Sequence, residues 1–488
     1  MKRNKTLLLS LILLATAASC RRDLLKPQPQ TSVADVSSFS SPARVQEQVL
    51  ALYGALKQGN FYGGRYVIDG DIKADNFINE LSNLVTGADV WNENPTNSAT
   101  AVIGLWQYAY LAINNANLFI DGMDSIGASV VGAASTANYI AEAKLVRALS
   151  YYSLLQYYAL PYANGGGSHA GVPLRLRGIK LAGQSNLTRS SVADIYTQII
   201  QDLNDAETGL PSKYSSAYNN TTRAHTNTAI ALKTRVYLSM GNWDSVIACA
   251  NRIVSASAPF TAATGVSNAL QSDITKVFVA PYTTTESILS MPMTITTGDN
   301  PGTQNQLAYY FSPSSKNGGV GNGEYSLNKN GVIADATWKG TDTRRKFIIA
   351  GGGKSWLTKY SAPSPYTDYV PVIRYSEVLL NLAEARVRST TSVDAQAVAL
   401  LNAVRGRSDA TTSWTIASFA TPDALIAQIL QERNIEFLGE GLRNNDLMRL
   451  QMSVPAKGSA PVKNPTDVGY IWPISATELA LNSLCTDN

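Results

Sequence analysis

Apolar residues recur at helical spacing through much of the chain. Within residues 142–161, EAKLVRALSYYSLLQYYALP, apolar side chains follow one another at steps of three and four, which predicts one buried helical stripe. The same period predicts a helix within residues 190–211. A further helix is expected after Thr421, because threonine is a suitable N-cap and Pro422 suits the first helical position.

Two segments predict pairs of helices joined by short turns. In residues 227–254 two apolar stripes flank Gly241 and Asn242, and helices joined by so short a turn must run antiparallel. A second pair is expected at residues 373–388 and 393–407. Such pairs resemble tetratricopeptide units, although no strict 34-residue period is present.

The pattern changes between residues 257 and 371, where Gly, Pro, Ser, Thr, Asn and Tyr dominate. Residues 287–295, SILSMPMTI, predict a short strand. Long loops on a rigid scaffold usually carry function, so the ligand-binding face is expected in this loop-rich region. We therefore predict a mainly α fold with a minor β contribution, whose helical scaffold comprises residues 105–256 and 372–450.

The first residues have the order of a secretory signal. Basic residues at positions 2, 3 and 5 precede an apolar run from Leu7 to Leu14, and small residues follow up to Ser19. The apolar run is shorter than the roughly 20 residues that span a bilayer, and no later stretch is long and apolar enough. We predict a signal peptide at residues 1–19 and no transmembrane helix.

Cys20 follows these small residues directly, in an arrangement that resembles the lipobox of bacterial lipoproteins. That resemblance implies cleavage before Cys20 and acylation of its thiol and amine, and two or more acyl chains hold a protein firmly on a membrane. The alternative is an ordinary cleaved signal followed by an incidental cysteine. Residues 20–42 are predicted to be a lipidated tether, and residues 43–488 a single folded body.

Composition excludes several functions. The net charge is +4 and no basic run follows Arg21 and Arg22, which argues against nucleic acid as a partner. Two histidines far apart in the sequence make a zinc site or a catalytic triad improbable, and no cofactor or metal is expected. Cys249 lies in an apolar helical pattern and is predicted to be a buried, inert thiol.

Motifs along nearly the whole chain match one family in order. The chain resembles SusD/RagB-type outer-membrane lipoproteins. The matching segments are WQYAYLAINNANLFID, EAKLVRALSYYSLLQYYALP, SSVADIYTQIIQDLNDAETGLP, the hairpin around GNWD, VPVIRYSEVLLNLAEARVR, LLNAVRGRS, ILQERNIEFLGEGLRNNDLMRL and GYIWPISATELALN.

This resemblance implies about four tetratricopeptide-like pairs under a face built from loops. It also implies a protein anchored at the outer membrane and facing the cell surface, where it captures oligosaccharides for a partner SusC-like TonB-dependent transporter without acting as an enzyme. Two alternatives remain open from the residues themselves. One is a helical-repeat adaptor that binds protein, and the other is a glycoside hydrolase, which would need two carboxylates about 5–10 Å apart across a cleft.

A sugar ring has an apolar C–H face and a hydroxyl edge, so a glycan site needs exposed aromatic rings beside polar side chains. Trp106, Trp243 and Trp472 lie in apolar patterns and are predicted to be core, while Trp338 and Trp414 are left open. Trp91 and Trp356 lie in polar or glycine-rich loops and are predicted to offer exposed rings. The complete set of glycan-binding candidates is Trp91, Asn94, Trp356, Tyr309, Tyr310, Arg65 and Asp75.

Overall fold

The computed structural model describes residues 37–488, with the exception of residues 182, 184, 303 and 391. The predicted signal, the predicted lipidation site at Cys20 and nearly all of the predicted tether lie outside the described residues. Within them, no helix is long and apolar enough to cross a membrane.

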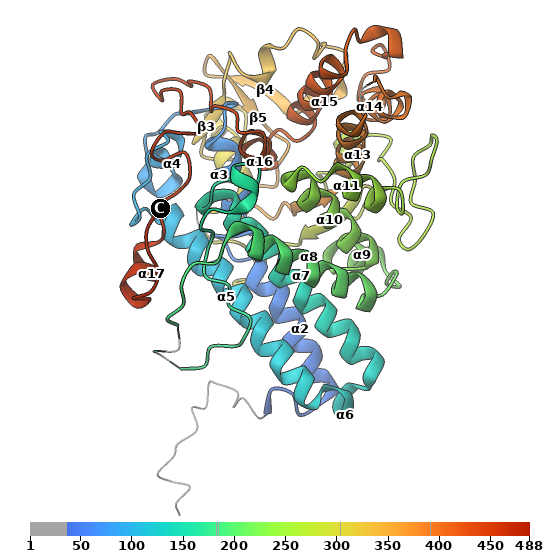
Figure 1. Ribbon diagram of the computed structural model, residues 1–488. Helices are drawn as coiled ribbons and strands as arrows, with labels where there is room; N and C mark the ends of the chain where they lie inside the picture. Colours follow the sequence, from blue (N-terminus) through green and yellow to red (C-terminus); the bar gives the residue numbers. More distant parts are fainter. Residues whose placement is uncertain (1–36, 182, 184, 303, 391) are drawn as a thin grey trace, which may run out of the picture.

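Long helices make up the lower half of the molecule in Figure 1, where α5 packs against α2 and α7, and α7 packs against α8. A π-helical turn and α6 connect α5 to α7. The bounds of these helices are α2 (Pro42–Leu56), α5 (Thr100–Gly122), α6 (Ala128–Val131), α7 (Ala133–Tyr158) and α8 (Val192–Gly209).

The helix predicted within residues 142–161 begins nine residues earlier, at Ala133. Residues 133–140 are exposed or half-buried, so this part of α7 has no apolar stripe from which a helix could be predicted. Gly132, with φ 79°, separates α7 from α6.

The predicted helix pairs are confirmed. Gly241, with φ 70°, ends the first helix of one pair, and the Asn242 side chain caps the second helix by accepting from the Ser245 amide. The pairs stack on each other, because α11 packs against α13 and α13 packs against α15. Their bounds are α10 (Thr226–Met240), α11 (Trp243–Ala250), α13 (Tyr375–Ser389), α14 (Ala395–Ser408) and α15 (Pro422–Glu436).

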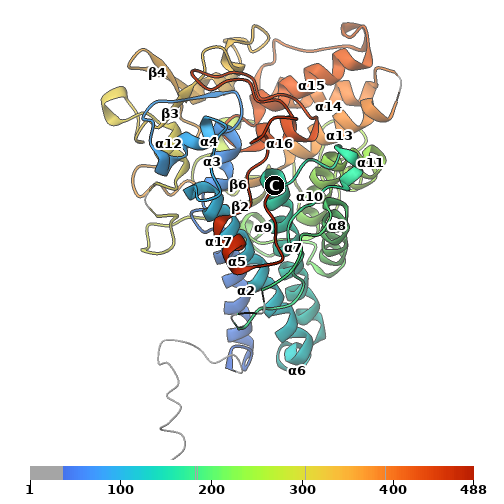
Figure 2. The same ribbon diagram turned by 60° about the vertical axis from the view of Figure 1, so that its left-hand side comes forward.

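The Thr421 side chain accepts from the Ala424 amide, which confirms the predicted cap of α15. Shorter helices complete the scaffold and the loop region, and Figure 2 shows α17 beside α5, where Glu478 accepts from the indole N–H of Trp106. The shorter helices are α3 (Arg65–Ile72), α4 (Ala88–Trp91), α9 (Ala217–Thr222), α12 (Leu307–Phe311), α16 (Leu442–Arg449) and α17 (Ala476–Leu481).

Among the described residues, the strands form three antiparallel pairs, β1 with β3, β2 with β6 and β4 with β5. The strand predicted within residues 287–295 is β2. The pairs β1–β3 and β4–β5 belong to the loop-rich upper part of the molecule in Figure 1. The bounds are β1 (Phe77–Asn79), β2 (Ser287–Met291), β3 (Tyr325–Leu327), β4 (Ile348–Gly351), β5 (Lys354–Leu357) and β6 (Val370–Arg374).

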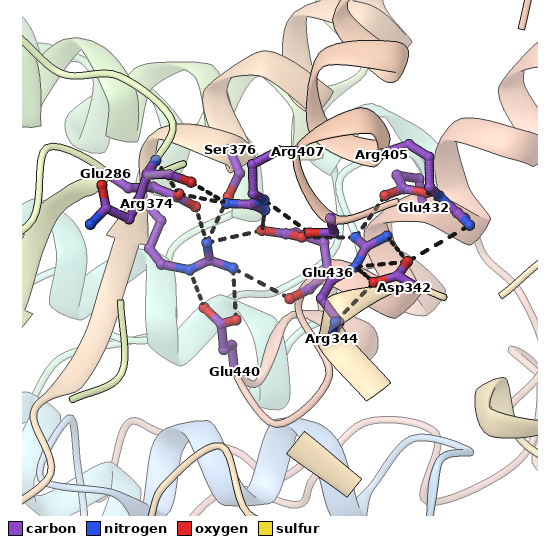
Figure 3. Close-up of polar contacts among 12 residues, drawn as sticks. Glu286, Asp342, Arg344, Arg374, Ser376, Arg405, Arg407, Glu432, Glu436 and Glu440 are labelled. Atoms are coloured by element: carbon purple, nitrogen blue, oxygen red, sulfur yellow. Dashed lines mark hydrogen bonds and ion pairs between the residues drawn. The ribbon is translucent and has the colours of Figure 1, made fainter. Parts of the chain in front are cut away.

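A buried ionic network joins the loop-rich region to the helices (Figure 3). Arg374, at the end of β6, donates to Glu436 and to Glu440, and it also pairs with Glu286 just before β2. The network holds equal numbers of positive and negative side chains, each at most 4% exposed, which makes their burial tolerable. Its members are Lys359, Arg344, Arg374, Arg405 and Arg407 with Glu286, Asp342, Glu432, Glu436 and Glu440.

Candidate functional site

The structure places the predicted tryptophan platforms inside the protein. All seven tryptophans lie in the described part of the chain, and none of them is exposed there. Trp91 is 5% exposed, and its indole N–H donates to the Phe77 carbonyl at 2.8 Å. Trp356 is 3% exposed and donates to the Gly351 carbonyl at 2.9 Å. The prediction that these two rings are exposed is wrong.

Close backbone approach explains both errors. A Cβ atom on Gly458 would lie 2.9 Å from the Trp91 ring, and one on Gly323 would lie 3.2 Å from the Trp356 ring. Each tryptophan is thus covered by a glycine distant from it in sequence. Trp106 and Trp472 are buried as predicted, whereas Trp243, also predicted to be core, is half-buried. Of the other two tryptophans, Trp338 is buried and Trp414 is half-buried.

Trp91 is therefore expected to stabilise the fold. Replacing Trp91 with Ala should lower the free energy of unfolding by about 3–5 kcal/mol, because it removes a large buried side chain and leaves a cavity. Urea unfolding would measure the loss. As a control, Asn94→Ala changes an exposed side chain and should stay within about 0.5 kcal/mol of the unchanged protein. Equal effects of the two substitutions would contradict the burial of Trp91.

The other candidates do not form an exposed site together. Arg65 is 4% exposed, and its guanidinium lies 5.1 Å from the centre of the fully buried Tyr310 ring. Asp75 accepts from Arg443 at 2.7 and 2.8 Å; burial opposes ionisation, but this partner lowers the pKa of Asp75 overall. Asn94 is exposed and Tyr309 is half-buried.

Tyrosines supply the accessible rings of the loop-rich region. The Tyr282 and Tyr369 rings stack with centres 4.5 Å apart and an interplanar angle of 16°. The Tyr309 and Tyr366 rings meet edge to face at 6.0 Å. These four are half-buried, while Tyr218, on α9, is 49% exposed. We call Tyr218, Tyr282, Tyr309, Tyr366 and Tyr369 the tyrosine cluster.

Backbone strain accompanies two members of the cluster. Tyr282 and Tyr366 both have φ 62°, in the left-handed region that a bulky residue rarely adopts. Asp368 helps to hold this arrangement, because its carboxylate accepts from the amides of Ser361 and Ala362 and, at 3.4 Å, from the Tyr282 hydroxyl. Strained residues held by their surroundings concentrate at functional sites, so the cluster is a candidate for one.

The cluster is positioned by rigid parts of the fold. Tyr369 directly precedes β6, and Tyr282 lies four residues before Glu286, which directly precedes β2. Since β2 pairs with β6 and the ionic network binds Glu286 to Arg374, both loops leave an immobilised strand pair. Rings held in this way lose little conformational entropy on binding a ligand.

Polar groups surround the rings. Asp299 pairs with Lys57; burial opposes ionisation of Asp299, but Lys57 and Thr294 lower its pKa overall. Burial raises the pKa of Tyr369, and the nearby Tyr218 and Asp299 raise it further, so the hydroxyl stays protonated at neutral pH. The cluster thus offers flat rings, neutral hydroxyls and a carboxylate, which together can bind both the face and the edge of a sugar.

Sequence reasoning found only Tyr309 of this cluster. The missed signals are the tyrosines of PYTTT (281–285) and SPYTDY (364–369), which stand in Pro- and Thr-rich segments without any apolar period. Tyr218 carries no such signal.

Other parts of the molecule fit a functional site less well. A hollow of about 470 Å³ between α2 and α5 takes none of its lining from the tyrosine cluster. Burial raises the pKa of Asp69 and of Asp71 to about 7, but these carboxyls are 1% and 0% exposed, so neither is open to a substrate in the conformation described. In the described residues, no group of three or more His, Cys, Asp or Glu side chains could hold a metal ion.

Comparison with known proteins decides the family. The crystal structure of a SusD superfamily protein from Bacteroides fragilis is 32% identical in sequence, with a TM-score of 0.81 over 92% of this chain and 99% of that one. This chain belongs to the SusD superfamily. Residues 307–488 match the SusD family, and residues 24–238 match a family described as "Starch-binding associating with outer membrane". The resemblance found in the sequence is thus confirmed, as is the mainly α fold.

Two further SusD-like proteins are more distant. "SusD-like protein P38" from Formosa agariphila is 23% identical over 96% of this chain and 94% of its own length. The surface glycan-binding protein A from Bacteroides thetaiotaomicron, solved with laminarihexaose, is 19% identical and has a TM-score of 0.72 over 92% of this chain and 99% of its own. At 19% identity, the comparison with the surface glycan-binding protein A shows a shared fold.

Proposed function

We propose that this SusD-superfamily chain binds oligosaccharides at the tyrosine cluster. The observation that carries the proposal is a group of partly exposed tyrosine rings, two of which flank the β2–β6 strand pair, in a chain whose tryptophans are all buried or half-buried. Membership of the SusD superfamily supports it, because one family that the chain matches is described as starch-binding and a protein of the same fold was solved with laminarihexaose.

The arrangement suits reversible capture. The stacked Tyr282 and Tyr369 rings can meet the C–H face of a pyranose, while tyrosine hydroxyls and Asp299 can bind its hydroxyl edge. A shallow site of this kind gives dissociation constants of roughly millimolar to micromolar, or about −4 to −8 kcal/mol. We propose capture and release without bond cleavage, so the protein is not an enzyme.

The finer proposal concerns location and partner. Cleavage before Cys20 and acylation there would anchor the protein at the outer membrane, facing the cell surface. The family description that associates residues 24–238 with the outer membrane supports this location. From there the protein would pass oligosaccharides to a SusC-like TonB-dependent transporter. Mass spectrometry of the mature protein would test the anchor, and co-purification from membranes would test the partner.

Replacing Tyr369 with Ala should weaken sugar binding at least ten-fold, a loss of about 1.4 kcal/mol or more, because one face of the ring stack is removed. Calorimetric titration with maltohexaose and laminarihexaose would measure it, using protein without residues 1–20. Tyr108→Ala, a half-buried tyrosine of α5 outside the cluster, is the matched control and should leave affinity unchanged.

Two results would contradict the proposal: unchanged affinity in the Tyr369→Ala variant, or no binding of any oligosaccharide on a broad glycan array. Chromatography of the sugars after prolonged incubation tests the absence of catalysis, since shorter products would reveal a hydrolase.

A further inference from the structure

Residues 81–87 lie over part of the loop-rich region, and several of their apolar side chains face solvent instead of the protein interior. Leu81, Leu84 and Val85 point apolar side chains to solvent, at 50%, 67% and 47% exposure. Grouped exposed apolar side chains often mark a functional surface, and a segment that departs from the usual inward placement of apolar residues is a candidate for one. We call residues 81–87 the strap.

Both ends of the strap have backbone conformations suited to a hinge. Ser82, near its start, has φ 51°, and Gly87, at its end, has φ 87°. The left-handed conformation of Ser82 costs free energy that a movement of the strap would release. Gly87 accepts its conformation without cost, because it has no Cβ atom.

Beneath the strap lie polar atoms that the fold leaves unpaired. Within the described part of the chain, no hydrogen-bond partner exists for Nη1 of Arg65 or Oδ1 of Asp69. Arg65 and Asp69 are 4% and 1% exposed. Each unsatisfied buried group costs about 1–3 kcal/mol, and more where it is charged. An unpaired buried polar group in a folded protein requires a cause, and contact with a ligand in another state of the protein is one such cause.

These groups converge on one place. A Cβ atom built on Gly87 would lie 3.7 Å from both Oδ1 of Asp69 and the hydroxyl of Tyr325. The Tyr325 ring is parallel to the Tyr310 ring with centres 6.0 Å apart, and the guanidinium of Arg65 lies over Tyr310. A donor on Arg65 and an acceptor on Asp69 thus lie directly under the strap.

We propose that the strap is a hinged cover over a second saccharide subsite, in which Arg65 and Asp69 meet one sugar residue when the strap moves away. This inference rests on the proposed function, because it assumes that the chain binds oligosaccharides. A guanidinium that donates and a carboxylate that accepts match two neighbouring sugar hydroxyls. With the strap closed, Arg65, a glycan-binding candidate from the sequence, donates to the Val85 carbonyl and is buried.

Few side-chain bonds need to break for the strap to open. Arg65 donates to the Val85 carbonyl, the Thr86 hydroxyl donates to Glu324 at 2.7 Å, and the Tyr325 hydroxyl donates to the Thr86 carbonyl at 2.9 Å. Each such bond contributes about 1 kcal/mol net, or somewhat more with a charged partner.

Thiol labelling tests the movement without any sugar. In protein without residues 1–20, Thr86→Cys places a thiol at a 0% exposed position under the strap, and Ser150→Cys places one at a 0% exposed position in α7 as the matched control. We expect a maleimide to label Thr86→Cys at least ten-fold faster than Ser150→Cys. Equal labelling rates would contradict the proposed movement of the strap.

Sugar binding tests the subsite. Asp69→Asn removes the carboxylate acceptor, and we expect it to weaken binding of maltohexaose or laminarihexaose at least five-fold. Saturating sugar should also change the labelling rate of Thr86→Cys at least three-fold. If the unchanged protein binds sugar and Asp69→Asn binds it with the same affinity, the proposed subsite is wrong, but the proposal for the tyrosine cluster is not affected. If the unchanged protein binds no sugar, the proposed function fails together with the subsite.

Discussion

Replacing Arg374 with Met should lower the free energy of unfolding by about 3–5 kcal/mol, the cost of leaving buried charges without their partner. Arg374 donates to Glu436 and Glu440 and pairs with Glu286, and all four side chains are at most 4% exposed. The substitution keeps an unbranched side chain of similar length, so the loss reports the missing charge more than missing volume. Urea unfolding at pH 7 measures it.

The matched control lies on the helix that follows. Arg386 pairs with Asp394 at 2.8 Å, but its side chain is 27% exposed, and such a pair contributes about 0–1 kcal/mol. Arg386→Met should therefore cost about 1 kcal/mol or less. If Arg374→Met costs no more than this control, the network does not hold the loop-rich region to the helices.

The same network predicts sensitivity to acid. Burial opposes ionisation of Glu436, yet the charges of Arg407, Arg374 and Arg344 hold the pKa of Glu436 well below its usual range. Because this carboxyl has a lower pKa in the folded than in the unfolded state, its contribution to stability is present above the unfolded value of about 4.5 and is lost as the pH falls further. The difference between the unchanged protein and Arg374→Met should shrink at low pH.

Replacing Asp69 with Asn should make the protein more stable at pH 8, by about 2–4 kcal/mol. Burial raises the pKa of Asp69 to about 7; Arg65 opposes this rise and Asp89 adds to it. The folded protein therefore holds this proton between pH 4 and 7, while the unfolded chain releases it. The contribution of Asp69 to the free energy of unfolding is fully present below about pH 4 and is lost as the pH rises through about 7. Asparagine does not ionise, so the Asp69→Asn variant does not suffer this loss.

Unfolding free energies of both proteins at pH 5 and pH 8 measure the effect, and the gain from Asp69→Asn should be much smaller at pH 5. Asp75→Asn is the control with the opposite sign, because Arg443 outweighs burial and lowers the pKa of Asp75. Asp75→Asn should cost stability at pH 8, and the cost should fade below about pH 4. A gain from Asp69→Asn that is equal at both pH values would show that ionisation is not its cause.

The helical scaffold could be predicted from the sequence because a helix that buries one face leaves a period in its own residues. The stripe of α8, the turn at Gly241 and the cap at Thr421 are each local, and all three are present. Where a helix buries nothing, as in the first turns of α7, the period is absent and the predicted start is late.

The ligand-binding side chains could not be chosen in the same way. Whether a loop residue is exposed depends on contacts from distant parts of the chain: Gly458 covers Trp91, and Gly323 covers Trp356. The residues around these two tryptophans have the composition of a sugar-binding platform, but the tryptophan rings themselves are buried.

The sequence alone determined the family, the mainly α architecture and most helix positions, since amphipathic periods, caps and ordered motifs are written in neighbouring residues. Only the tertiary structure decided which rings reach solvent. The tyrosine cluster draws on residues 218, 282, 309, 366 and 369, and it exists because the pairing of β2 with β6 and the buried network bring together loops that lie far apart along the chain.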